Sequence, residues 1–363
     1  MAQRVVIYEW ASSGGLSGPD RLIFQGDESV MTAIKREGRA MLMAVCRDLA
    51  RDDRFEPVVL LGEGDFSLPD RCQVVRVAFG EEIHALEKHS AEAPWTLPIA
   101  PETKGVLQQR VHRIEQAGGR AIAPSADWIA VAADKHRTIG ELAARGIAVP
   151  AGRSVNPGEM VPPDFIRPMV IKADASVGCD GLEMLFEGQP SLREESTRVE
   201  ALCAGQPVSV ACLVGLKKIL CLPACLQRIS IGPQENHPSY KGGEVPIALN
   251  LAKRAERLAY RAVTAMKDAT AIRGSRVIGW IGVDLILGDR EDGRDDRVLE
   301  INPRITTSIV GLVELSHSSL IGAMIDLAEG SDSIADLVFQ SGCRMRFDAS
   351  GTVDRICDDD KVF

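Results

Sequence analysis

Short apolar runs alternate with longer amphipathic stretches over the first 125 residues. Four short segments have the apolar, β-branched composition of buried strands, namely residues 4–10, 57–64, 72–79 and 94–102. Two longer segments, residues 29–52 and 104–119, place apolar side chains at helical spacing, and the second closes on a pair of glycines. Because strands and helices alternate, the pattern predicts an open parallel α/β layer, an N-terminal domain over residues 1–123.

Residues 124–330 hold further predicted helices and strands. We expect a capped helix near Ser125 and Asp127, a second helix from Lys135 to Gly146, a strand–turn–strand unit over 167–185, three β-rich segments over 198–231, a loop over 237–247 and a helix from Leu251 to about Met266. Residues 331–363 alternate in polarity and end in three aspartates, which predicts a small β appendage or a tail.

Two apolar runs near the C-terminal end, Val277 to Leu287 and Arg297 to Ser308, flank a polar loop and predict an antiparallel hairpin. Each strand carries an acid, Asp284 or Glu300, and Asn302 shares the face of Glu300. A buried carboxylate is costly unless it is paired or holds a cation. Two acids and an amide would suit Mg²⁺. The alternative is an ordinary hairpin whose acids lie at solvated ends or pair with arginines.

Further candidate binding residues lie in three other stretches of the chain. Lys172 lies inside the apolar run MVIKA, where a lysine needs an anionic partner. The small-residue loop after it, residues 175–181, could lay backbone N–H groups over phosphates or could be an ordinary turn. Near the N-terminus, the strand predicted over residues 4–10 carries one acid, Glu9, and the glycine-containing loop that follows is either substrate-facing or simply a turn. Lys135 taken alone is typical of a surface lysine.

Composition narrows the function classes. The 363 residues are 45% hydrophobic and 26% charged, and their net charge of −9 argues against a nucleic-acid binder. No apolar run reaches the roughly 18–20 residues that cross a membrane. Nine cysteines, spread among aliphatic neighbours without a C-x-x-C motif, indicate reduced thiols. With no signal-peptide pattern at the start, we expect a cytoplasmic protein.

The order of these features resembles the ATP-grasp ligases, in which two α+β lobes hold ATP between them. The resemblance covers roughly Pro94 to Gly330 and rests most firmly on E-I-N-P-R after an acidic strand. It implies an ATP-grasp fold with a central lobe at about 134–205, a C-terminal lobe at about 206–330, and an N-terminal pre-ATP-grasp domain. The implied cofactors are ATP and Mg²⁺, for which Mn²⁺ could substitute.

The resemblance also implies a role for individual residues. For ATP it implies contacts by Lys135, Lys172, Ser176, Gly178, Gly181, the adenine hinge Glu200, Ala201 and Leu202, and the metal-binding Asp284 and Glu300. For the metals it implies Asp284 on one ion, Glu300 bridging two, and Asn302 on the second. For catalysis it implies Lys172 with Arg228 and Arg304 at the transferred phosphate, and for substrate it implies Glu9, Gly242, Gly243 and Glu244. One departure concerns the ribose, since the usual acid is replaced by Ala204.

Several motifs narrow the resemblance to the tyramine–glutamate ligases of methanofuran and methylofuran biosynthesis within that family. These are VIYEWASSGG, PIAPE, LQR, YKGGEVPI and EINPRITTSIVGL. This implies that glutamate, as an acyl phosphate, is joined to tyramine or a related amine in one-carbon cofactor synthesis, with Glu244 as a guessed general base. The alternatives are another acid–amine pair, such as one with tyrosine, an ATP-grasp kinase, or a non-catalytic nucleotide-binding regulator. The expected partners are small molecules, neither nucleic acid nor membrane, and a homodimer stays open.

Overall fold

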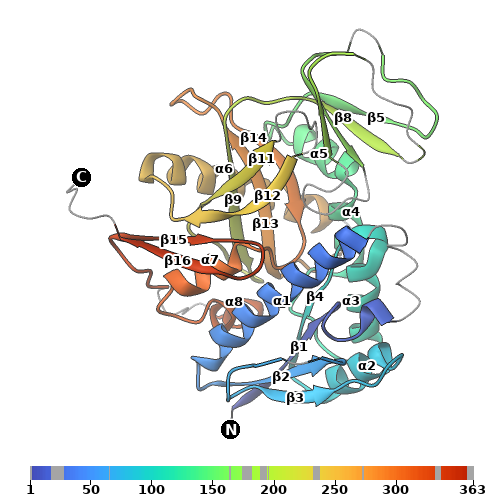
Figure 1. Ribbon diagram of the computed structural model, residues 1–363, viewed down its shortest axis with the longest axis vertical. Helices are drawn as coiled ribbons and strands as arrows, with labels where there is room; N and C mark the ends of the chain where they lie inside the picture. The colour runs from blue at the N-terminus through green and yellow to red at the C-terminus, as the bar shows by residue number, and fades with distance from the viewer. Residues whose placement is uncertain are drawn as a thin grey trace.

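The protein is seen here in a computed structural model. It describes residues 2–17, 28–64, 66–162, 165–173, 182–188, 194, 196–231, 238–271, 274–331 and 337–357. Three sheets are stacked along the longest axis, with the N-terminal sheet at one end and a small antiparallel sheet at the other (Figure 1). No helix among these residues is both long and apolar enough to cross a membrane.

The N-terminal sheet is parallel, in the order β3-β2-β1-β4, which confirms the predicted α/β layer. Its strands are β1 (Gln3–Glu9), β2 (Phe55–Leu61), β3 (Gln73–Arg76) and β4 (Trp95–Ile99). Alternate residues of β1 enter different cores, with Val5 and Ile7 in one and Val6 and Tyr8 in the other. The continuous apolar run of β1 therefore reflects a strand that is covered on both faces.

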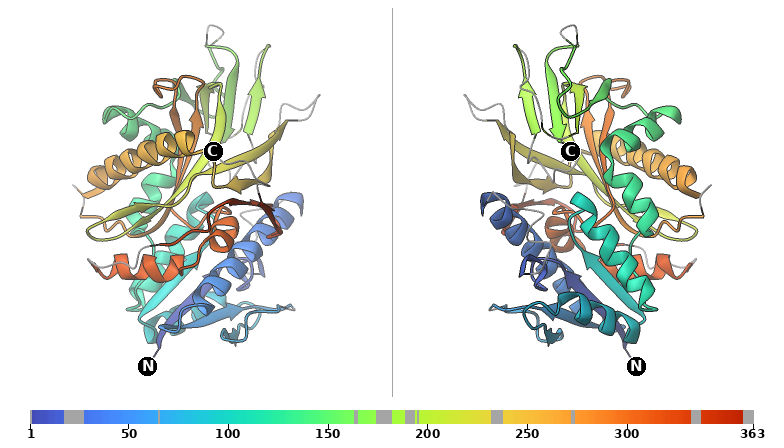
Figure 2. Two further views of the ribbon diagram at one scale, coloured as in Figure 1. Left: turned by 90° about the vertical axis from the view of Figure 1, so that its left-hand side faces the viewer. Right: turned by 90° about the vertical axis from the view of Figure 1, so that its right-hand side faces the viewer.

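Helices cover both faces of this sheet. They are α1 (Glu28–Ala50), α2 (Glu82–Glu92) and α3 (Val106–Gln116), with short 3-10 turns η1 (Gly15–Ser17) and η3 (Thr103–Gly105). The helix α2 was not predicted from the sequence. Helix α1 packs against β2 and also against the C-terminal helices, so it lies between the N-terminal sheet and the rest of the molecule (Figure 2).

Two short helices lead into the small antiparallel sheet. They are α4 (Ala126–Ala133) and α5 (Lys135–Ala144), and the Asp134 carboxylate caps α5 by accepting the Arg137 N–H at 2.8 Å. The small sheet has the order β5-β8-β6-β7. Its strands are β5 (Gly152–Val155), β6 (Met169–Ala173), β7 (Leu182–Leu185) and β8 (Thr197–Ala201), so the predicted strand–turn–strand unit is confirmed as β6 and β7.

The third sheet has eight strands, in the order β14-β13-β9-β11-β12-β15-β16 with β10 paired to β9. They are β9 (Gln206–Val214), β10 (Ile219–Cys221), β11 (Cys225–Ile231), β12 (Pro238–Val245), β13 (Gly279–Leu287), β14 (Arg297–Asn302), β15 (Cys343–Phe347) and β16 (Val353–Cys357). Helices α6 (Leu249–Ala271), α7 (Ile309–Leu315) and α8 (Leu320–Ala328) pack on it.

Two predictions about residues 198–247 were wrong. Residues 198–231 hold four strands, β8 to β11, where three segments were expected. The expected loop at 237–247 is largely the strand β12, which pairs with β11 on one side and β15 on the other. Its lysine and glycines do not read as a strand, and its pairing partners supply the regularity that its composition lacks. The C-terminal hairpin β15–β16 thus extends the main sheet.

Candidate active site

The predicted antiparallel hairpin is confirmed as β13 and β14, and its register sets the centre of the candidate site. Asp284 lies directly opposite Glu300, and Gly282 lies opposite Asn302. The register shifts just after Asp284, because Leu285 pairs with Val298. Residues two apart on a strand share a face, so the two acids and the amide project together. A Cβ on Gly282 would lie 2.5 Å from a methyl of Thr306, so the glycine permits the close approach of the following turn.

The Asp284 carboxylate is held by two amides. Gln227 of β11 donates to one oxygen at 2.9 Å and Asn302 donates to the other at 3.0 Å. Burial, together with the negative charge of Glu300, raises the pKa of Asp284 to about 6. Two carboxylates that repel each other in a buried place favour a cation between them. The donors are hard oxygens, which suit Mg²⁺, although no three His, Cys, Asp or Glu side chains of the described residues gather as a metal cluster.

Lys135 connects α5 to this hairpin through an ion pair with Glu300. The lysine is 8% exposed, so the expectation of a surface lysine was wrong. Burial alone would lower its pKa, but the charges of Glu300, Glu102 and Asp284 raise it. Because Asp134 caps α5, the helix begins at Lys135, and this position directs the lysine side chain toward the two acids.

Arg304 follows β14 and forms an ion pair with Glu102, which comes just after β4 of the N-terminal sheet. The second hydrogen bond of the pair, from Nη2 to Oε1, is 3.2 Å long. Burial would raise the pKa of Glu102, but the charges of Arg304 and Lys135 lower it. Glu102 is 6% exposed and links the two domains at the site. The sequence analysis missed this residue, whose signal was an acid directly after a buried parallel strand.

Lys172 has the anionic partner that its place in β6 demanded. Its Nζ lies 2.7 Å from Oε2 of Glu200, and the other oxygen of Glu200 lies 2.6 Å from Nε of Arg198. Arg198 also contacts Nδ1 of His136 at 3.0 Å. Burial would raise the pKa of Glu200, but Lys172 and Arg198 lower it. The three residues form a charged cluster on β6 and β8, of which the sequence analysis identified only Lys172 and Glu200.

The predicted adenine hinge lies at the end of β8. The Ala201 N–H donates to the Ala151 carbonyl at 2.8 Å, and the Leu202 N–H donates to the Pro168 carbonyl at 2.9 Å. A base at this position would therefore meet carbonyl groups or replace one of these bonds. Ala204 is exposed in the turn that follows. The predicted phosphate-covering residues Ser176, Gly178 and Gly181 lie outside the described residues.

Arg228 lies next to the site residue Gln227, at the point where the pairing of β11 with β12 shifts register. Its side chain is exposed, and within the described part of the chain it forms no ion pair. A charged side chain at this bulge can turn toward a ligand without breaking a protein contact. Its role at the phosphate stays a prediction.

Gly242, Gly243 and Glu244, predicted to contact substrate, lie in β12 against the C-terminal hairpin. Gly242 has φ of +100°, and a Cβ there would lie 1.9 Å from the Phe347 carbonyl oxygen. At Gly243 a Cβ would lie 2.6 Å from the Leu226 carbonyl oxygen. Packing therefore requires both glycines. Glu244 forms ion pairs with Arg346 at 2.8 Å and Arg344 at 3.4 Å. These pairs stabilise the charged carboxylate and so make it a weaker base for the amine.

Glu9, the remaining predicted substrate residue, is 2% exposed at the end of β1. Its carboxylate accepts the N–H groups of Ala11 at 3.1 Å and Ser12 at 2.7 Å. Gly38 of α1 packs directly over it, since a Cβ there would lie 2.3 Å from Oε1. Burial raises the pKa of Glu9 to about 7, although the two N–H groups partly counter this.

This pKa predicts a pH-dependent effect of Glu9→Gln on stability. The pKa is higher in the folded protein than in the unfolded chain, so the free energy of unfolding falls as pH rises through the interval between 4.5 and about 7. Glutamine does not titrate. We expect the variant to gain roughly 2 to 3 kcal/mol relative to the parent between pH 5 and pH 8, measured by urea unfolding. Exposed Glu56→Gln on β2 is the control, and an equal difference at both pH values would contradict the prediction.

Comparison with known families places these residues in context. Residues 132–308 match the family described as ATP-grasp domain, and residues 50–129 match the family described as pre ATP-grasp 3 domain. Two curated relatives are tyramine–L-glutamate ligases. The one from Methanocaldococcus fervens is 30% identical over 218 residues, which span 60% of this chain and only 61% of that enzyme. The one from Methanocaldococcus jannaschii is 25% identical over 314 residues, 85% of each chain.

Solved structures share the fold. An ATP-grasp superfamily protein from Archaeoglobus fulgidus superposes with a TM-score of 0.67 at 21% identity, covering 99% of this chain and 100% of that one. Biotin carboxylase from Campylobacter jejuni, in a complex described as β-γ-ATP, gives a TM-score of 0.64 at 15% identity, covering 95% of this chain and 75% of that one. Asp284, Glu300, Asn302, Lys135, Lys172, Glu102 and Arg304 lie within the matched ranges, whereas Glu9, at the end of β1, lies before them.

Proposed function

Since this chain belongs to the ATP-grasp family of ligases, which form amide and other C–N bonds, we propose that it joins the side-chain carboxylate of glutamate to tyramine or a related amine. The two curated relatives support the choice of substrates, because both are tyramine–L-glutamate ligases. A role in the synthesis of a methanofuran-type cofactor is part of the same proposal.

The observation that carries the proposal is the convergence of opposite charges from separate segments. Asp284 and Glu300 of the hairpin meet Lys135 of α5, while Arg304 meets Glu102 of the N-terminal sheet. These groups are buried or half-buried, so the effective dielectric constant around them is low. Their charges therefore act strongly on a ligand bound between them. A site of this kind stabilises a transferring phosphoryl group by position and charge and needs no protein nucleophile.

The acidic residues would bind the metal, and the basic residues would bind the phosphates. Asp284, Glu300 and Asn302 would hold Mg²⁺, which when bound would neutralise the phosphate oxygens of ATP. Lys135 and Lys172 would contact phosphates, and each is held in place by a glutamate before nucleotide arrives. Arg304 would hold the transferred phosphate, oriented by Glu102.

The reaction balances without a further reagent. A carboxylate oxygen of the acid substrate attacks the γ-phosphorus, the bond to the bridging oxygen breaks, and ADP leaves with that electron pair. The amine nitrogen then attacks the acyl carbon, phosphate leaves, and the nitrogen loses a proton to give the amide. Arg304 and Lys172 would stabilise the negative charge of the acyl phosphate.

A substrate panel tests the proposal. We expect ADP release with ATP, Mg²⁺ and L-glutamate to depend on tyramine, and mass spectrometry to find an amide and free phosphate in equal amounts. Stimulation of ADP release by tyrosine and not by tyramine would identify tyrosine as the amine substrate. A phosphorylated product without an amide would indicate a kinase, and no stimulation by any amine would refute this substrate pair.

A further inference from the structure

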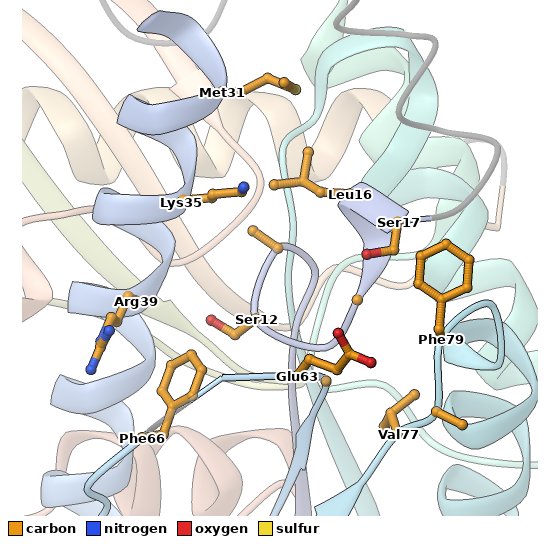
Figure 3. Close-up of a pocket in the computed structure, with 14 residues that line it drawn as sticks. Ser12, Leu16, Ser17, Met31, Lys35, Arg39, Glu63, Phe66, Val77 and Phe79 are labelled. Carbon is orange, nitrogen blue, oxygen red and sulfur yellow. The ribbon is translucent and has the colours of Figure 1, made fainter. Parts of the chain in front are cut away.

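A cavity of about 510 Å³ lies at the carboxyl edge of the N-terminal sheet (Figure 3). Its wall comes from the loop after β1, from helix α1 and from the loops after β2 and β3. Open α/β sheets bind ligands outside the carboxyl ends of their strands. The volume is in the range of small-molecule sites. None of the residues assigned above to ATP, metal or catalysis is part of its lining.

Three charged side chains line this cavity, namely Lys35 and Arg39 of α1 and Glu63, and the guanidinium of Arg39 lies over the ring of Phe66, 4.6 Å from its centre. Lys35 extends from α1 toward Leu16, and Glu63 enters from the loop after β2 (Figure 3). Neither forms an ion pair within the described part of the chain. Apolar side chains complete the wall, among them Met31 and Phe79, a residue that is 73% exposed. A ligand with a carboxylate, an ammonium group and an apolar body would satisfy all three features.

The backbone of the cavity does not favour a phosphate. In the loop after β1, the N–H groups of Ala11 and Ser12 are already given to the Glu9 carboxylate. The Gly15 N–H is given to the Trp10 carbonyl at 2.8 Å. A glycine loop that binds phosphate needs such N–H groups free. The anion would therefore be held by the Lys35 side chain, which suits a single carboxylate.

Helix α1 stands between this cavity and the Arg304 pair. Lys35 lies on the side of α1 that lines the cavity. Glu37 lies two residues further along, about 200° around the helix from Lys35. Burial raises the pKa of Glu37, and the positive charge of Arg304 partly counters this rise, so Glu37 faces the Arg304 side. Gly38 packs on Glu9 between these two sides. A ligand in the cavity would thus be separated from the proposed reaction centre.

We propose that this cavity is a second binding site, for an aromatic α-amino acid. The carboxylate pairs with Lys35, the ammonium group with Glu63, and the ring packs against Leu16 and Phe79. A decarboxylated aromatic amine leaves Lys35 without an anion and binds weakly. The site goes beyond the proposed ligase function and does not depend on it.

Calorimetric titration of the full chain without ATP tests this site. We expect L-tyrosine to bind, and both tyramine and 3-(4-hydroxyphenyl)propionate to bind at least about tenfold more weakly, since each lacks one charged group. Lys35→Met and Glu63→Gln should each weaken L-tyrosine binding by about tenfold. The matched control is Lys253→Met, which removes an exposed lysine of α6 and should leave the affinity unchanged.

Tyramine binding as tightly as L-tyrosine would overturn the proposal, as would Lys35→Met with parental affinity. Absence of heat with all three compounds at about 2 mM, close to the solubility limit of L-tyrosine, would also overturn it. The two proposals fail separately. Glu300→Gln should lose ADP release and keep L-tyrosine binding. An active ligase that does not bind L-tyrosine refutes only the second site, and L-tyrosine binding by an inactive chain refutes only the ligase.

Discussion

Replacing Glu300 by glutamine is expected to reduce the rate of ADP release by roughly 10²- to 10³-fold. Glu300 faces Asp284 across the hairpin and pairs with Lys135, so it contributes both to the proposed metal site and to the position of a phosphate-binding lysine. Glutamine keeps the shape and one acceptor oxygen but removes the charge. The measurement is steady-state ADP release at saturating ATP and Mg²⁺.

Glu291→Gln is the matched control for this change. Glu291 lies in the exposed loop of the same hairpin, so the variant makes the same chemical substitution away from the site. It should keep the parental rate. The melting temperature of Glu300→Gln should also stay close to that of the parent, because Lys135 retains Glu102 and Asp284 as negative neighbours. A Glu300→Gln rate within about threefold of the parent would remove this residue from the mechanism.

Replacing Arg304 by methionine is expected to lower kcat about 100-fold, because a paired guanidinium at the transferred phosphate is lost. The same change leaves Glu102 buried without its partner, so the melting temperature should fall as well. A double variant separates the two effects. Arg304→Met with Glu102→Gln removes the stranded charge and should recover stability but not kcat.

Arg254→Met provides a comparison for the loss of a buried ion pair. Arg254 pairs with Asp296 at the far end of the same sheet, and both side chains are largely buried. This variant should lose stability while kcat stays parental. If the double variant at Arg304 and Glu102 regained kcat together with its melting temperature, the role of Arg304 would be structural only.

The parts that the sequence predicted correctly have local causes. The hairpin β13–β14 follows from two apolar, β-branched runs around a polar loop. Period-two alternation then brings Asp284, Glu300 and Asn302 to one face in any antiparallel register that pairs the acids. The demand for an anionic partner at Lys172 is equally local, because a lysine in an apolar strand is costly wherever the strand lies.

The failures arose where the structure depends on a distant partner. The strand β12 has a glycine-rich composition, and it is a strand because β11 and β15 pair with its two edges. Gly242 is required by the backbone of a hairpin about a hundred residues later in the chain, and Gly243 by the backbone of β11. A local pattern does not specify either contact. The C-terminal segment likewise becomes part of the main sheet only through β12.

The sequence by itself therefore determined most of the strands and helices, with α2 and β12 as exceptions, and the chemical types of most site residues. Tertiary structure alone decided the pairing. Arg304 reaches Glu102 across a separation of 202 residues, and Lys135 reaches Glu300 across 165. Such pairs depend on how the two domains pack, and burial rather than spacing makes them specific. The same packing of α1 against the N-terminal sheet forms the cavity beside Lys35 and Glu63, which no run of residues announces.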